Sequence, residues 1–168
     1  MLKIRPSTDE DVPRITEIYS YYVRETTTSL EFTPPTVDEI HTRRIGILSR
    51  NMPYLVVTYD ESIVGFAYCD WFKLREGYRF TAETTIYLDK DYRGRAIGRS
   101  LLSALIDEAR QRGLRKLIAC IGDSNNQQSI HLHRSFGYHH IGTIKSGGEK
   151  FNQWLDVIFM EKNLVEID

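Results

Sequence analysis

The chain has few of the features that mark disulfide-rich, membrane or nucleic-acid-binding proteins. It contains 2 cysteines and 5 prolines in 168 residues, and its formal net charge is −1. Cys69 and Cys120 lie in apolar, strand-like runs, so we expect buried free thiols and no disulfide scaffold. The near-neutral charge provides no broad basic field for nucleic acid or an acidic membrane surface.

Long apolar runs are absent as well. No stretch approaches the length of a membrane span, and Met1–Pro6 contains no signal-peptide core. The content of 41% hydrophobic and 27% charged residues is typical of a soluble globular protein. A chain of this length suits one well-filled domain and is short for two. We therefore expect a single domain over residues 1–168, located in the cytoplasm, with no nucleic-acid or membrane partner.

A mixed order of strands and helices follows from the hydrophobic periodicity. It predicts strands over residues 2–6, 54–59, 63–71, about 80–88, 116–121, 138–143 and 155–160. It predicts helices over about 12–22, after Thr36 with Ile40, Ile45 and Leu48 inside, over about 96–112, and over about 126–136. This order favours an α/β (α+β) domain whose mixed sheet has helices on both faces.

The most informative stretch is Arg93-Gly94-Arg95-Ala96-Ile97-Gly98, between a β-rich run ending at Leu88 and a helical apolar pattern. A short turn that opens a helix exposes backbone N–H groups at the positive end of the helix dipole, and the arginines add charge. This combination predicts an anion site, most naturally for a phosphate. An ordinary strand-to-helix turn with solvated arginines has the same local pattern.

Glu83 lies in the strand-like run before this turn, on the opposite alternation phase from Ala82, Thr84 and Ile86. A carboxylate at this position can simply face solvent. It can also face a cleft, where partial desolvation would raise its pKa towards that of a useful general base. The strand pattern alone is compatible with both interpretations.

Four histidines cluster near the last predicted helix, at positions 131, 133, 139 and 140. His131 and His133 are two residues apart and lie on different sides of a helix. No cysteine or carboxylate completes a zinc-type spacing, so we expect no metal site.

Asn126 can cap this helix, and His133 follows nearly two turns later on the same side. A capped amphipathic helix with a surface histidine explains the pattern too, although one histidine can serve as a proton donor.

Taken in order, these residues resemble the GNAT superfamily of acetyl-CoA-dependent N-acetyltransferases. The Arg93–Gly98 turn is similar to that family's phosphate-binding pattern, Gln/Arg-x-x-Gly-x-Gly/Ala, with Ala96 where glycine is usual. Residues 126–138 match its Asn-x-x-Ala/Ser-x-x-Leu-Tyr/His-x-x-x-Gly-Phe/Tyr segment. The segments that look like the phosphinothricin acetyltransferase branch, which includes enzymes acting on methionine sulfone and methionine sulfoximine, are 28–35, 81–88, 121–123, 132–133 and 150–157.

The resemblance implies a single-domain GNAT fold whose mixed, mostly antiparallel sheet splays open between the strands ending at Leu88 and Ile121. Glu83 matches the general-base position, and His133 matches a position that can protonate the departing thiolate. The resemblance also implies a homodimer, for which 147–154 and 156–160 are our candidate contacts. It implies an acetyl-CoA site without a metal, formed by Ile86, Tyr87, Leu88, Arg93, Gly94, Arg95, Ala96, Ile97, Gly98, Arg99, Asn126 and Ser129.

The expected acceptor is the α-amino group of a small amino-acid-like compound, acetylated by direct transfer. Our candidate substrate-binding residues are Leu30, Glu31, Arg75, Tyr78 and Arg79. A guanidinium fork suits a carboxylate or a phosphinate, although Arg75 and Arg79 can equally be exposed loop arginines.

Two other functions stay open. A GNAT enzyme could acetylate a protein N-terminus or a polyamine, but a polyamine needs an acidic groove, which the Arg75 and Arg79 pair argues against. A non-catalytic acyl-CoA-binding sensor would need the phosphate turn but not Glu83. The presence of both Glu83 and His133 therefore favours an enzyme.

Overall fold

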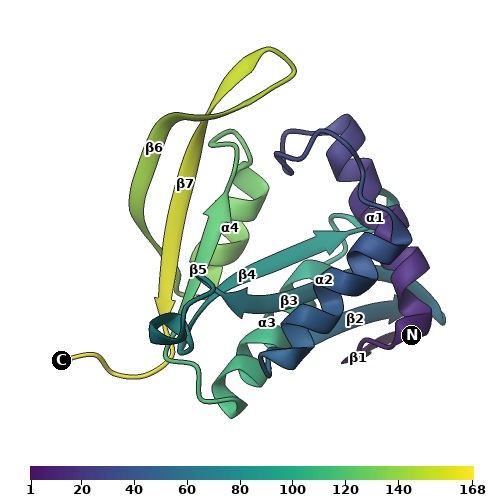
Figure 1. Cartoon of the computed structure of the whole chain (residues 1–168), viewed down its shortest axis with the longest axis horizontal. Helices are drawn as coiled ribbons and strands as arrows, with labels where there is room; N and C mark the ends of the chain where they lie inside the picture. The colour runs from purple at the N-terminus through teal and green to yellow at the C-terminus, as the bar shows by residue number, and fades with distance from the viewer.

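The computed structural model describes residues 1–168 and contains one seven-stranded sheet in the order β1-β2-β3-β4-β5-β7-β6 (Figure 1). The β4–β5 pair is parallel, and all other neighbouring strands are antiparallel. The predicted order of elements and the mixed sheet are confirmed. The strands are β1 (Leu2–Pro6), β2 (Tyr54–Tyr59), β3 (Ser62–Trp71), β4 (Thr81–Leu88), β5 (Lys116–Ile121), β6 (His139–Lys150) and β7 (Gln153–Asn163).

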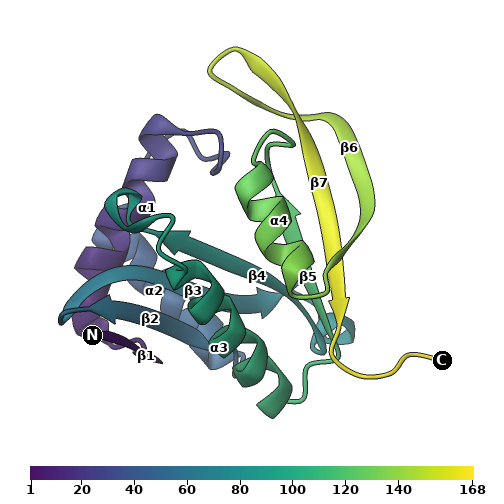
Figure 2. The ribbon, with the colours of Figure 1, turned by 180° about the vertical axis from the view of Figure 1, so that it is seen from behind.

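Four helices cover the two faces of the sheet: α1 (Val12–Glu25), α2 (Val37–Ser49), α3 (Ile97–Gln111) and α4 (Gln127–Ser135). Helices α1 and α2 lie in front of the sheet in Figure 1, and the reverse view in Figure 2 shows α3 and α4 over the other face. The side chains that α3 turns to the sheet are aliphatic and buried. None of the helices has the length and apolar character needed to cross a membrane.

Local sequence explains where the helices begin and end. Helix α2 starts with a capping box, in which Thr36 Oγ1 accepts from the Glu39 N–H at 3.1 Å and the Glu39 carboxylate accepts from the Thr36 N–H at 2.8 Å. Asn126 caps α4, because its Oδ1 accepts from the Ser129 N–H at 3.2 Å. Helix α3 ends before Gly113, whose φ of +78° suits glycine.

The inward face of α2 differs from the expectation. Ile45 and Leu48 are exposed, not inside. A buried arginine occupies this face instead: the Arg44 guanidinium donates to Ser7 Oγ at 2.8 Å and to Asp9 at 2.5 Å. Because these partners satisfy its charge, Arg44 can occupy the buried face of α2, where the apolar pattern predicted Ile45 and Leu48.

Two further expectations need correction. Cys69 is buried, but Cys120 reaches solvent, because it lies on the part of β5 that no longer pairs with β4, although neighbouring residues still desolvate its thiol. The last two strands are longer than predicted and form one long hairpin, with register shifts that interrupt its alternation. The segment 156–160 lies in β7, which pairs with β5 on one side and β6 on the other. Both backbone edges of residues 158–160 are therefore occupied within the chain.

Candidate active site

The site begins where β4 and β5 separate. Residues Thr81–Glu83 pair with Lys116–Ile118, and the two strands then diverge (Figure 2). From Thr84 to Leu88, β4 is bonded to β3 along one edge only, so its other edge faces the gap. A cavity of about 60 Å³ occupies this gap and is lined by residues of β4, β5 and α4.

A larger cavity of about 480 Å³ lies between β4, the start of α3, and α4. Arg95 and Ile97 do not line it: Ile97 is buried in the core, and the Arg95 guanidinium lies 5.0 Å from the ring of Tyr92. The other predicted coenzyme residues do line it, and these are Ile86, Tyr87, Leu88, Arg93, Gly94, Ala96, Gly98, Arg99, Asn126 and Ser129.

The turn before α3 has the geometry of an anion site. Gly94 and Ala96 have φ values of 76° and 60°, which fold the chain tightly into the helix. The N–H groups of residues 97–99 have no carbonyl of the same helix to bond, because the helical ladder starts with the Ser100 N–H and the Ala96 carbonyl at 3.3 Å. Amide donors at the positive end of a helix dipole favour a phosphate. Ala96 holds a left-handed conformation that costs an alanine about 1–2 kcal/mol.

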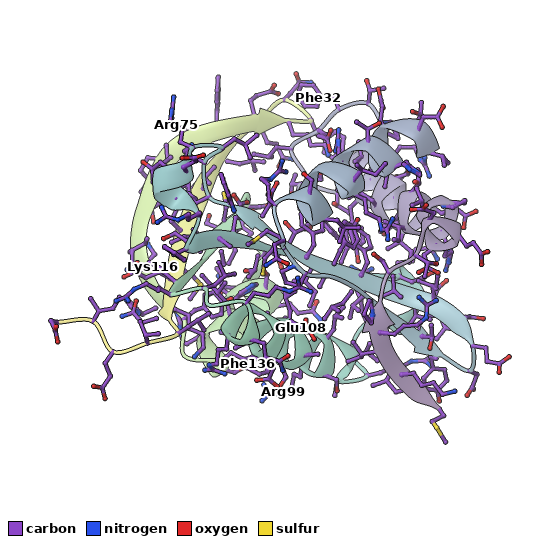
Figure 3. All side chains as sticks on the ribbon, turned by 60° about the horizontal axis from the view of Figure 1, so that its bottom comes forward. Phe32, Arg75, Arg99, Glu108, Lys116 and Phe136 are labelled. Atoms are coloured by element: carbon purple, nitrogen blue, oxygen red, sulfur yellow. The ribbon has the colours of Figure 1, made fainter.

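Arg93 and Arg99 supply positive charge to the same cavity. Arg93 Nε donates to the Lys90 carbonyl at 3.2 Å. Arg99 donates to Ser135 Oγ at 2.7 Å, and its guanidinium lies 5.1 Å from the ring of Phe136, beside which Figure 3 shows it. Both arginines stay exposed, so their charges are available to a pyrophosphate at the turn.

His133 is buried on the α3–α4 face of β4. Its ring lies 4.9 Å from that of Tyr138, whose hydroxyl is 3.3 Å from Thr84 Oγ1. Nδ1 lies 2.7 Å from the Ser129 carbonyl, which can only accept, so Nδ1 is the donor and Nε2 of the neutral ring is an acceptor. Nε2 is buried without a hydrogen-bond partner, and burial lowers the pKa of His133. In this state the ring can accept a hydrogen bond at the gap but has no proton to donate there.

Glu83 lies on the opposite face of β4. Side chains alternate along a strand, and Tyr87, on the same phase as Glu83, packs with its ring 5.1 Å from that of Tyr19 in α1. Glu83 is half-buried, and desolvation raises its pKa, with a smaller lowering by Lys73 and a smaller increase from Asp70. A raised pKa brings a carboxylate closer to the range of a general base. Glu83 therefore lies on the other face of β4 from His133, at the last position that pairs with β5, and it lines neither cavity.

This arrangement fits the coenzyme of an acyl transfer. The helix N-terminus and two arginines suit a pyrophosphate, and the free edge of β4 offers backbone groups to an amide-containing arm. His133 Nε2 is an unpaired acceptor at the gap where such an arm would end. No group of three or more histidine, cysteine or acidic side chains is placed to hold a metal ion.

Comparison with known proteins decides the family. A model of the acetyltransferase (GNAT) family matches residues 15–138. The chain belongs to the GNAT family.

Relatives of this GNAT protein are similar over nearly its whole length. It is 39% identical over 161 residues to a phosphinothricin N-acetyltransferase of Alcaligenes faecalis, covering 96% of this chain and 82% of that protein. It is 37% identical over 165 residues to an L-methionine sulfoximine/L-methionine sulfone acetyltransferase of Pseudomonas aeruginosa, covering 96% and 94%. A crystal structure of a phosphinothricin acetyltransferase from Sinorhizobium meliloti in complex with AcCoA has a TM-score of 0.94 at 36% identity, covering 97% and 88%. The chain is therefore an acetyltransferase.

In this GNAT enzyme the loop after α1 crosses the open end of the gap. Thr28 lines both cavities. Leu30 reaches the end of β5, where a Cβ on Gly122 would come within 3.3 Å of it. The Glu31 carboxylate forms an ion pair with Arg43 at 2.7 Å. Leu30 thus lies at the gap, whereas the charge of Glu31 is already satisfied within the protein.

The loop between β3 and β4 carries Arg75, Tyr78 and Arg79, all of which are exposed. None of them lines either cavity. Arg79 donates to the Glu76 carbonyl at 3.0 Å and lies 4.4 Å from the ring of Phe80. Arg75 lies at the outer edge of the molecule (Figure 3). These residues are on the segment that leads into the strand of Glu83.

Four residues of α4 line the larger cavity but were not among the predicted coenzyme residues. Gln128, His131, Leu132 and Ser135 of α4 line it. Their spacing of three or four residues places them on one face of the helix, which is a signal that the sequence does contain.

Lys150 is a second residue whose role the sequence did not reveal. It is buried at the end of β6, where its ammonium donates to the Ser29 carbonyl at 2.6 Å and to the Tyr22 carbonyl at 3.5 Å. Desolvation lowers its pKa. Lys150 therefore ties the tip of the β6–β7 hairpin to the loop after α1, although in the sequence it is only one member of the 150–157 motif.

Replacing Gly98 by glutamate is expected to weaken acetyl-CoA binding by about ten- to a hundredfold while the fold is kept. A Cβ here would meet only Leu88 and Leu132, at 3.5 and 3.7 Å, so a side chain is tolerated. The new carboxylate would place a negative charge where the pyrophosphate is expected. Isothermal titration measures the affinity, and a circular dichroism melt checks the fold.

The matched control is Gly98→Ala, which adds only a methyl group and should bind acetyl-CoA nearly as the wild type does. Unchanged affinity in a folded Gly98→Glu variant would remove this turn from the coenzyme site.

Proposed function

We propose that this enzyme transfers the acetyl group of acetyl-CoA to the α-amino group of a small amino-acid-like compound, such as phosphinothricin, methionine sulfone or methionine sulfoximine. The observation that carries the proposal is the two-sided gap, with the coenzyme cavity on one face of β4 and the half-buried Glu83 on the other. The acceptor class is supported by the names of the relatives, each of which matches 96% of this chain.

In the proposed mechanism both substrates meet at the gap and transfer is direct. Glu83 takes a proton from the acceptor ammonium, directly or through water, and the free amine attacks the thioester carbonyl. A backbone N–H on the free edge of β4 stabilises the oxyanion. The C–S bond then breaks, and the CoA thiolate leaves on the His133 side, where it takes up the proton that the new amide nitrogen releases, directly or through water. His133 can supply that proton only as an imidazolium, which burial disfavours, so we assign Nε2 the role of a hydrogen-bond acceptor for the departing thiol.

Glu83→Gln keeps the shape of the side chain and removes its basicity. We expect kcat to fall on the order of 10²–10⁴-fold, the usual contribution of a positioned proton acceptor. Thiol release from acetyl-CoA in the presence of methionine sulfone measures the rate. Wild-type activity of this variant across pH 6 to 9 would exclude Glu83 as the base.

The same variant should be more stable than the wild type at neutral pH. Desolvation raises the pKa of Glu83, so its contribution to the free energy of unfolding is present at acidic pH and is lost as the pH rises through the folded-state pKa. Glutamine carries no charge to desolvate, and the gain at pH 7 should shrink towards pH 4. Urea denaturation at both pH values measures it, and a loss of stability at pH 7 would contradict the assignment.

Carboxylate recognition by Arg75 or Arg79 can be tested with an acid and its amide. Replacing the responsible arginine by methionine should lower kcat/KM about ten- to a hundredfold for an amino-acid acceptor. The loss should shrink for the amide, which lacks the partner charge. Arg24→Met, which removes an exposed arginine at the end of α1, is the control and should leave kcat/KM unchanged.

Equal losses on the acid and the amide would show that neither arginine reads the carboxylate. The acceptor would then be an amine without one, and the assignment would return to a general GNAT acetyltransferase.

We further propose that the enzyme is a homodimer, joined through the outer face of the β6–β7 hairpin. Next to its turn the hairpin exposes Phe151 at 51% and Trp154 at 73%, and Ile144, the register partner of Val157, is exposed at 52%. A cluster of this kind is more typical of a contact surface than of a solvated one. Trp154→Glu should convert the dimer to a monomer in light scattering at micromolar concentration, while Ile45→Glu on α2 should not. A monomeric mass for the wild type would refute the proposal.

A further inference from the structure

Asp70 lies directly opposite Glu83. The two residues are register partners in the antiparallel β3–β4 pair, so their side chains project from the same face of the sheet. Arg50, which follows α2, meets Asp70 with two hydrogen bonds, Nε to Oδ1 at 2.7 Å and Nη2 to Oδ2 at 2.8 Å. Asp70 Oδ1 also accepts from the Trp71 N–H at 2.8 Å. The carboxylate beside Glu83 is therefore held in place and paired.

We infer that the Arg50–Asp70 ion pair sets the charge background of Glu83: Asp70 presents a carboxylate next to the proposed base, and Arg50 cancels much of that charge. Two carboxylates at neighbouring cross-strand positions repel each other, and this repulsion keeps a proton on one of them. A guanidinium bonded to Asp70 reduces the repulsion. Arg50 and Asp70 are thus positioning residues that act through Glu83. The inference rests on the proposed role of Glu83 as the base.

Several other titratable groups lie near Glu83, but those described next are either neutral or already paired, except for Lys73. Tyr68 on β3 and Cys120 on β5 are neutral at pH 7, because desolvation raises the pKa of both, that of Cys120 to about 11. Lys73, after β3, is exposed and favours the charged form of Glu83. Lys116 and Glu161, on the same face further along the sheet, pair with each other at 2.7 Å.

The side chains of Arg50 and Asp70 are 24% and 27% exposed, so solvent screens their effect only in part. At the separation of cross-strand neighbours, one uncancelled charge in this setting corresponds to a change of about half to one pH unit in the titration of Glu83. An effect of this size is readily measured in a pH profile.

The test uses two single variants, one that removes the positive charge of the pair and one that removes its negative charge. Arg50→Met leaves Asp70 uncancelled and should move the acidic limb of the kcat/KM profile up by about half to one pH unit. Asp70→Asn leaves Arg50 uncancelled and should move it down by a similar amount. The double variant should return the limb close to its wild-type position, and Arg50→Lys should preserve it. Arg110→Met, which breaks an exposed pair with Asp107 on α3, is the control and should move nothing.

A structural role alone would not produce shifts of opposite sign that cancel in the double variant. Shifts of the same sign in both single variants, or no shift in either, would overturn the inference. The titration of the Glu83 carboxyl carbon by NMR, assigned by its loss in Glu83→Gln, gives a readout independent of activity. Suppose that the single variants shift this titration in opposite directions while Glu83→Gln is fully active. This result would refute Glu83 as the base but support the effect of Arg50 and Asp70 on its titration. An inactive Glu83→Gln with unshifted titrations would refute the charge balance alone.

Discussion

Strands β4 and β5 stop pairing after Glu83 and Ile118, and the site depends on this break. A continuous ladder would use the free edge of β4 and close the gap. Because the ladder ends, residues 84–88 keep an edge that no strand pairs with, beside the larger cavity. The proposed mechanism requires that side chains from opposite faces of β4 act at this gap. At the open end, Lys150 and Leu30 join the two separated parts through the loop after α1.

Several residues of the proposed site adopt states that destabilise the folded protein. Glu83 is a desolvated carboxylate, Ala96 holds a left-handed backbone, and His133 Nε2 is buried without a partner. Each feature costs on the order of 1–3 kcal/mol. Ala96 lies in the turn that we propose binds the pyrophosphate, and Glu83 and His133 lie where we propose that chemistry occurs, whereas the aliphatic face of α3 packs without such exceptions. Local rules tend to fail at functional sites for this reason.

The order of elements and the segments that line the larger cavity were predictable because those signals are local. The Arg93–Gly98 turn and the Asn126 cap depend on residues within a few positions of each other. The same holds for the alternation that separates Glu83 from Ala82. The resemblance to the GNAT family then predicted that these separate segments form one site.

Other features depend on contacts between distant segments and were not predictable. Ile45 is exposed because Arg44, held by Ser7 and Asp9, takes the inward position. The Arg50–Asp70 pair joins residues 20 positions apart on different elements. The exposure of Cys120 follows from where β4 leaves β5, which no pattern within β5 reveals. Side-chain partners of this kind are decided by the packing of elements and not by local periodicity.

The central claim is that coenzyme and acceptor meet at the gap from two faces, with no covalent intermediate. Initial rates measured while acetyl-CoA and methionine sulfone are both varied test this claim most directly. Direct transfer predicts intersecting reciprocal plots, because both substrates must be bound before reaction. Cys120, on the Glu83 face, is a poor nucleophile because its pKa is raised to about 11. Parallel plots, together with an acetylated Cys120 in the mass spectrum, would contradict the account.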